Sequence, residues 1–454
     1  MAKGRVTRRL LFLLVALLYL VLVGVGVLPN PLPAALAWLT ADRPLAEGVT
    51  WQDRLGSRPA AATVAGDAVA VAAGSEGALY QRADGTPIGE AELADWEAEW
   101  VAGISAGDHA VLLSRARGQD GYQVRDPATG RIQWEETRAV AVWGFADGWL
   151  DLRCDRKRAC QLRAYQPGRM EPRWRVDLPG ERDGMLGTDP PLTGGAAPAG
   201  TRITAGALGR TPMPRVQGFP ITRGRERAVV IVDLEAGRIR QELPVAEGEQ
   251  LLVVGDRVIR STMADHHGVC VSTVSGHDPD TGELVWGPEQ FHLWTTDGYG
   301  CQQRVPPLMG GAAVTAVSLD GRPMVIDAYS GRRLWVGEPG EWVETLSSTL
   351  AVVRATDEQL RYAVQLGDGE RLWERRAARR AEFRLAECGL IVVDQDPDRI
   401  YVWEPATGQS RVAVSSSARV LACADDGIVI ANGRYVGFAP FDGGEGDEPS
   451  SAAG

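Results

Sequence analysis

From about residue 48 onward, short segments of alternating apolar and polar positions, or of β-branched residues, follow one another along the chain. Residues Ala228 to Leu234 read AVVIVDL and residues Arg399 to Pro405 read RIYVWEP, and both patterns are typical of half-buried strands. Gly, Pro, Asp and Ser separate these segments, and helical periodicity is nearly absent after residue 46. The pattern predicts an all-β domain.

One turn phrase recurs between these segments. DPATGRIQW, DPDTGELVW and DAYSGRRLW each place Gly four residues before Trp, and GDGERLW is a weaker copy. Degraded copies surround Gly85, Gly168, Gly237 (with Gln241 at the Trp position) and Gly408, and most turns lie about 40–50 residues apart, which is the period of propeller blades. The repeat residues are Asp126, Gly130, Trp134, Asp278, Gly282, Trp286, Asp327, Gly331, Trp335, Gly369 and Trp373.

The residue types of the phrase indicate a structural hairpin. Asp and Thr form hydrogen bonds with nearby backbone, and Gly adopts the positive φ that closes a tight turn. The Trp that follows is expected to bury its ring against the neighbouring blade in every repeat. We predict a β-propeller of four-stranded blades, with eight blades favoured and seven to nine possible. The segment GVTWQDRL, Gly48 to Leu55, is expected to complete the last blade, which residues 419–440 begin.

The phrase D-x-x-T/S-G-x-x-x-W resembles the repeat of the pyrroloquinoline-quinone-like propeller family, over residues 48–440. That family contains quinoprotein alcohol dehydrogenases and also non-catalytic propellers such as the outer-membrane assembly lipoprotein. The dehydrogenase resemblance would imply a quinone in the central channel, a calcium ion and a disulfide between adjacent cysteines. This chain has no adjacent cysteines, and no catalytic residue can be carried over. We therefore expect neither quinone nor calcium.

The first 28 residues differ from the rest of the chain. A basic cap precedes nineteen uncharged residues, Leu10 to Leu28, which as a helix would just cross a hydrocarbon core of about 30 Å. The basic residues predict a cytoplasmic N-terminus, a transmembrane signal anchor and an extracytoplasmic C-terminal domain in the cell membrane. A cleaved signal peptide ending at Ala35-Leu36-Ala37 is the alternative. The predicted domains are the cap and anchor at 1–28, a linker at 29–47, the propeller at 48–440 and a disordered acidic tail at 441–454.

Six cysteines suit an oxidising compartment. Cys154 and Cys160 flank the hydrophilic stretch DRKRA, where a disulfide could join two strands at a hairpin tip. The pairing of the others stays open, and free buried thiols are the alternative. These others are Cys270, Cys301, Cys388 and Cys423.

Two polar clusters invite a metal interpretation that we do not favour. ADHHGVC, Ala264 to Cys270, combines His and Cys, but adjacent residues on a strand point to opposite faces, so a polar loop is preferred. DQDPD, Asp394 to Asp398, resembles a calcium loop but lacks its Gly and distal Glu, so a solvated turn is preferred. An irregular stretch from Pro179 to Arg227 is either a disordered connection or a binding loop.

The net charge of −11 does not indicate a nucleic-acid surface. The sequence therefore favours a membrane-tethered, extracytoplasmic propeller that acts as a non-catalytic scaffold for an extracytoplasmic or membrane protein. The alternative is a quinoprotein-like oxidoreductase, or a sensor of a small ligand in the central channel.

Overall fold

The computed structural model describes Leu45 and residues 48–89, 93, 96–116, 118–155, 159–179, 181–182, 202–266, 269–293, 295–296, 303–305 and 307–441. The predicted anchor at 1–28, nearly all of the linker and the acidic tail from 442 lie outside these ranges. Within them, no helix combines the length and the apolar character that crossing a membrane requires. The anchor and the tail therefore stay predictions.

The first half of the chain forms consecutive antiparallel sheets, because alternating residues are separated by short Gly-containing turns. A three-stranded sheet comes first, and three four-stranded sheets follow, with one short 3-10 helix inside the last. The strands are β2 (Pro59–Ala65), β3 (Ala68–Ala73) and β4 (Glu76–Gln81); β5 (Trp100–Ala106), β6 (His109–Arg115), β7 (Tyr122–Arg125) and β8 (Ile132–Glu136); β9 (Ala139–Gly144), β10 (Trp149–Cys154), β11 (Cys160–Tyr165) and β12 (Trp174–Leu178); and β13 (Glu181–Arg182), η1 (Ala205–Leu208), β14 (Val216–Arg223), β15 (Glu226–Asp233) and β16 (Arg238–Pro244).

The second half continues the same pattern. One sheet of eight strands contains two four-stranded units, which are joined where Phe291 and His292 of β20 pair with β24. The strands β21 and β22 form a separate two-stranded sheet. The strands are β17 (Glu249–Val254), β18 (Arg257–His266), β19 (Val269–His277), β20 (Leu284–His292), β21 (Thr295–Thr296), β22 (Gln303–Val305), β23 (Met309–Gly310), β24 (Ala313–Ser318), β25 (Pro323–Asp327) and β26 (Arg333–Val336); β27 (Trp342–Leu346), β28 (Leu350–Arg354), β29 (Leu360–Gln365) and β30 (Arg371–Arg376); and β31 (Glu382–Ala386), β32 (Gly389–Gln395), β33 (Asp398–Trp403) and β34 (Ser410–Val414).

The last sheet joins the two ends of the described chain. Its order is β1 (Trp51–Arg54), β37 (Tyr435–Pro440), β36 (Gly427–Asn432) and β35 (Arg419–Ala424). Trp51 pairs with Phe438 in an antiparallel register, and its side chain is buried. The expected pairing of the segment from Gly48 to Leu55 with the last strands is confirmed. Leu45, which falls within the predicted linker, packs in the core of this region.

The hydrophobic core lies between successive sheets. On β3, Val69 and Val71 pack toward the β35–β37 sheet, whereas Ala70 and Ala72 pack toward β5 and β6. Successive residues of a strand point to opposite faces, so each central strand is apolar on both sides. This explains why the central strands read as nearly continuous apolar runs.

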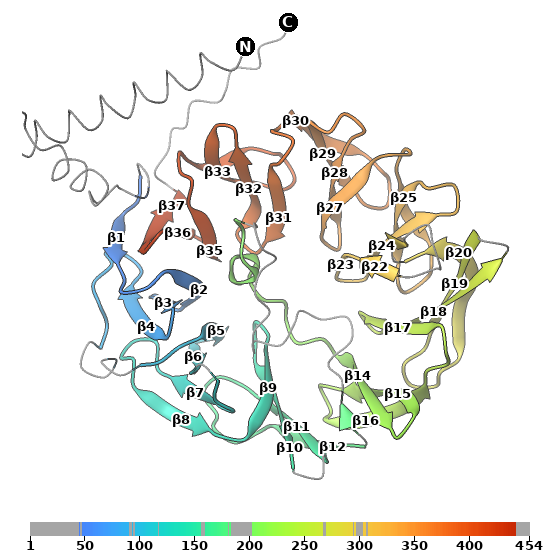
Figure 1. Ribbon diagram of the computed structural model, residues 1–454, viewed down its shortest axis with the longest axis horizontal. Helices are drawn as coiled ribbons and strands as arrows, with labels where there is room; N and C mark the ends of the chain where they lie inside the picture. The colour runs from blue at the N-terminus through green and yellow to red at the C-terminus, as the bar shows by residue number, and fades with distance from the viewer. Residues whose placement is uncertain are drawn as a thin grey trace, which may run out of the picture. The chain divides into compact units, whose positions relative to one another are not determined.

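Figure 1 shows these sheets following one another around a common centre, with β2, β5, β9, β14, β17, β23, β27, β31 and β35 nearest to it. When the eight-stranded sheet is divided between β20 and β24, the described strands form nine consecutive groups. The preferred count of eight blades is not confirmed.

Candidate functional site

The repeated aspartates form turns. The Asp278 carboxylate accepts the backbone N–H groups of Asp280 at 2.8 Å and Thr281 at 2.9 Å, and the Gly282 N–H donates to the Asp278 carbonyl at 2.9 Å. Gly282 has a φ of 73°, which favours glycine. Asp126 and Asp327 accept hydrogen bonds in the same way from the residue two positions later. These carboxylates therefore organise local backbone, as the sequence predicted.

The Trp of one repeat docks on the turn of the next. The Trp286 indole N–H donates to the Ala328 carbonyl at 2.8 Å, and a Cβ added at Gly331 would lie 2.6 Å from the Trp286 ring. Trp373 repeats the arrangement, since it donates to the Pro405 carbonyl at 2.8 Å. The turn Gly is therefore needed for close approach as well as for its positive φ. The docking links consecutive sheets.

Two of the repeat Trp residues depart from this arrangement. Trp134 and Trp335 are only half-buried, although each packs against a buried cluster that includes residues of the next sheet. Trp134 lies against Tyr122 and Tyr165, with ring centroids 5.6 and 5.2 Å away. The Trp335 ring instead lies over Gly337, the residue that follows the end of β26.

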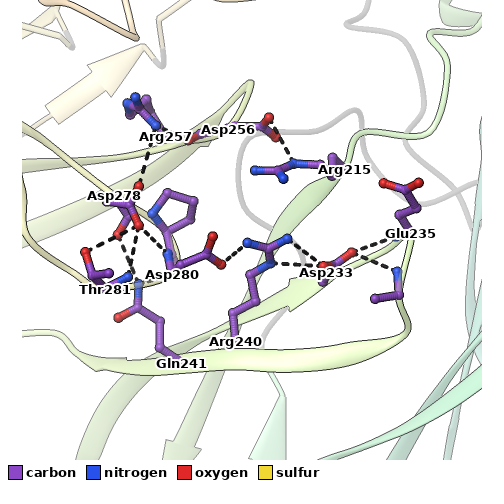
Figure 2. Close-up of polar contacts among 12 residues, drawn as sticks. Arg215, Asp233, Glu235, Arg240, Gln241, Asp256, Arg257, Asp278, Asp280 and Thr281 are labelled. Atoms are coloured by element: carbon purple, nitrogen blue, oxygen red, sulfur yellow. Dashed lines mark hydrogen bonds and ion pairs between the residues drawn. The ribbon is translucent and has the colours of Figure 1, made fainter.

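At the turn around Gly237, polar residues replace the Trp (Figure 2). The Gln241 side-chain amide donates to the Pro279 carbonyl at 2.6 Å, which is the acceptor position that Trp uses elsewhere. The adjacent Arg240 donates to the Asp233 carboxylate at 2.6 Å and also contacts Asp280 in the next turn. The sequence shows that Gln241 stands at the Trp position of this repeat, but it did not predict the hydrogen bond from Gln241 to Pro279.

The Asp233–Arg240 pair is buried, with exposed side-chain fractions of 5% and 7%. Burial alone would raise the pKa of Asp233. Hydrogen bonds from the backbone N–H of Ala236 and from Arg240 outweigh that effect and hold the pKa of Asp233 below its usual value. The pair therefore stays charged, and the additional contact of Arg240 with Asp280 joins two repeats.

A cavity of about 2290 Å³ is lined by the innermost strands and their loops, drawn from successive sheets. It is larger than the roughly 300–1,000 Å³ typical of small-molecule sites. Among the lining residues are Thr63, Trp100, Trp143, Val253, Leu346 and Leu385. The cavity is the main candidate for a functional site.

Part of the irregular stretch from Pro179 to Arg227 runs along this cavity. Residues 183–201 lie outside the described residues, but the segment from Arg202 to Pro214 contributes to the cavity wall before β14 begins. At one end, the Ile203 backbone forms a parallel bridge with Val420 of β35. At the other, the Met213 N–H donates to the Asp147 carboxylate at 2.8 Å. Figure 1 shows this green segment crossing the centre between β9 and β35. We call Arg202 to Gly209 the inner segment.

Two buried carboxylates show the raised pKa that often marks catalytic acids. Burial raises the pKa of Glu344, which lines the cavity, although Arg361 donates to it at 3.0 Å. Burial likewise raises the pKa of Asp151, which accepts from Tyr122 at 3.1 Å but does not line the cavity. Arg361 holds Glu344, and Tyr122 and Arg153 both bond to Oδ2 of Asp151, whereas the buried Oδ1 of Asp151 has no hydrogen-bond partner.

The five cysteines in the described ranges are disulfide-bonded. Cys154 and Cys160 lie opposite each other on β10 and β11 and form a disulfide. Cys388 and Cys423 form a second one, which the sequence could not assign. Cys270 is also disulfide-bonded, so the alternative of free thiols is wrong for these five.

The two polar clusters are only partly described. In ADHHGVC, His267 and the side chains of Asp265 and His266 lie outside the described residues. In DQDPD, Asp394 accepts backbone N–H groups of its own turn, whereas Asp398 pairs with Arg202 at 2.9 Å. Among the described residues, no three His, Cys, Asp or Glu side chains are grouped so that they could hold a metal ion.

A family model described as outer membrane protein assembly factor BamB matches residues 271–387. This range contains two strong copies of the phrase, from Asp278 to Trp286 and from Asp327 to Trp335. The match supports a pyrroloquinoline-quinone-like β-propeller family. No curated protein matches the chain.

Several solved structures are similar. BamB from Moraxella catarrhalis is 14% identical with a TM-score of 0.39, covering 74% of this chain and 95% of that one. A eukaryotic initiation factor is 10% identical with a TM-score of 0.48, covering 86% and 92%. The β-propeller domain of the Trilobed protease from Pyrococcus furiosus is 9% identical with a TM-score of 0.36, covering 74% and 97%. At these identities the likeness concerns the fold alone.

Proposed function

We propose that this protein is a closed β-propeller, tethered to the membrane by residues 1–28, that binds other proteins outside the cytoplasm without catalysing a reaction. One observation carries the proposal. The cavity is larger than a typical small-molecule site, and a stretch of polypeptide already lies along its wall, held by main-chain and side-chain hydrogen bonds. A site with these properties suits an extended protein segment.

Further observations support the remaining parts of the proposal. The pairing of β1 with β37 favours closure of the ring, because it leaves fewer sheet edges open. The disulfides suit an oxidising compartment, and the uncharged run from Leu10 to Leu28 suits a single membrane span. The matching family model is named for an assembly factor of outer membrane proteins, and a scaffold role fits that description.

Site-specific crosslinking in cells tests the proposal. A photo-crosslinking amino acid at Leu308, which is 38% exposed and lines the cavity, is expected to capture protein partners that mass spectrometry identifies. The matched control is Leu284, which is 54% exposed on β20 and does not line the cavity. Equal capture at both positions would contradict the proposal. A quinone absorbance band in the purified protein would favour the oxidoreductase alternative.

A further inference from the structure

The cavity-facing edge of β35 is paired with the inner segment. In its sheet, β35 is the end strand, so this edge has no other strand beside it. The Val420 N–H donates to the Arg202 carbonyl at 2.8 Å, and the Thr204 N–H donates to the Val420 carbonyl at 3.0 Å. An open sheet edge is a template for pairing with an extended chain. Here the chain's own residues use that template.

The Arg202 side chain is held by acceptors on several loops. Its guanidinium donates to the carbonyls of Ser416 at 2.7 Å and Ala418 at 2.9 Å, and to that of Asp394 at 3.2 Å. It also pairs with the Asp398 carboxylate at 2.9 Å. A guanidinium presents five donors in a fixed plane, and a lysine could not satisfy this spread of acceptors. The pocket is therefore specific for arginine.

The next two residues of the inner segment are also recognised. Ile203 is 6% exposed and packs with the buried cluster that includes Val402 and Val420. The Thr204 hydroxyl donates to the Leu421 carbonyl at 2.9 Å. Arg202, Ile203 and Thr204 thus meet a guanidinium pocket, an apolar pocket and a hydroxyl acceptor in turn. This alternation suits an extended strand, because the side chains of a strand alternate in direction.

We infer that the inner edge of β35 is a binding site for an extended segment of a partner protein that reads Arg, then an apolar β-branched residue, then Thr. In this structure the inner segment occupies the site in cis, so a partner has to displace it. The inference rests on the proposed scaffold function and deepens it, because it names the chemistry of the recognised segment. Binding by strand addition combines main-chain hydrogen bonds for affinity with side-chain pockets for specificity.

A labelled synthetic peptide of the inner segment, RITAGALG, tests the inference by fluorescence anisotropy with the full chain. Wild-type protein is expected to bind it weakly, because a tethered segment competes at an effective concentration in the millimolar range. Arg202→Ala loosens the segment and is expected to tighten peptide binding at least tenfold. Arg215→Ala is the matched control, since its half-exposed side chain pairs with Asp256 rather than with the β35 site. A peptide with Ala in place of Arg should bind at least tenfold more weakly.

Equal affinity of wild type and a folded Arg202→Ala protein would overturn the inference. Should that variant not fold, hydrogen exchange in the wild type answers the question. Excess peptide is expected to expose the Thr204 amide while the Val420 amide stays protected, and unchanged exchange at Thr204 would overturn the inference. Partner capture at Leu308 without peptide binding would reject this site and leave the scaffold function standing. Peptide binding without any captured partner would reject the scaffold function, and with it the assignment of a partner protein, while leaving the β35 edge as a site that binds extended peptide.

Discussion

The Trp286 indole donates a hydrogen bond to the Ala328 carbonyl at 2.8 Å and so joins one repeat to the next. The bond spans 42 positions of sequence, which is close to the repeat period. Trp286 covers Gly331, which an alanine could not replace without a clash. The repeated phrase is therefore a joint between sheets as well as a turn.

The docking of Trp286 predicts that Trp286→Ala and Trp335→Ala will lower the free energy of unfolding by unequal amounts. Trp286→Ala should cost about 3–5 kcal/mol in the free energy of unfolding, because it removes a buried ring and leaves a cavity. Trp335→Ala should cost clearly less, since its ring is half-buried. Replacing Asp278 or Asp327 by Ala should cost about 0.5–1.5 kcal/mol each through lost turn hydrogen bonds. Denaturant unfolding measures all four, and an equal loss for both Trp variants would contradict the docking.

The Asp233–Arg240 pair predicts a large effect of removing one charge. Arg240→Met should destabilise the fold by about 3–5 kcal/mol, because it leaves the Asp233 carboxylate buried without its partner. The double variant Asp233→Asn with Arg240→Met is the control and should recover much of that loss. Unfolding at pH 7 measures both. Equal stability of the single and double variants would show that burial of the charge is unimportant.

The same pair predicts an acid dependence. The pKa of Asp233 is lower in the folded chain than in the unfolded chain, so its stabilising contribution is complete above the unfolded value of about 4. It is lost as pH falls through the lower folded value. The double variant should therefore lose less stability than wild type between pH 5 and pH 2. Parallel melting curves across this range would contradict the assignment.

The burial of His292 predicts a second effect of pH on stability, in a higher pH range than that of Asp233. Burial lowers the pKa of His292 below its usual value of 6.5, and its Nδ1 lies 2.9 Å from the Ser272 hydroxyl. The unfolded chain takes up a proton first as pH falls, so stability should decrease below about pH 6.5. His292→Gln should reduce this decrease, whereas the control His109→Gln, at an exposed position, should not. Thermal melts from pH 8 to pH 5 provide the comparison.

The pairing of β1 with β37 predicts that the two termini contribute unequally to stability. Deleting residues 48–55 removes β1 and the buried Trp51 and bares the edge of β37, so the melting temperature should fall sharply. Truncation of Trp51 alone should cost about 3–5 kcal/mol. Deleting residues 443–454 should change the melting temperature little. Equal losses of melting temperature in the two deletions would contradict a stabilising role for the pairing of β1 with β37.

The sequence by itself determined the features that depend on neighbours a few residues away. The turn hydrogen bonds from Gly282 to Asp278 span four positions, and Cys154 and Cys160 are six positions apart. Such contacts follow from local residue types, because Gly permits positive φ and Asp accepts from nearby backbone. The strand pattern and the pairing of β1 with β37 followed from periodicity and from the need to cover a sheet edge.

Only the tertiary structure decided what depends on distant partners. Cys388 lies in a buried cluster shared by the last two sheets, and Cys423 packs against the same cluster. Arg202 finds its side-chain acceptors 192 to 216 positions further along the chain. Trp286 and Trp335 occupy the same position in the phrase, yet only Trp286 is fully docked. Burial and long-range pairing depend on the shape of the neighbouring sheet, which local periodicity does not encode.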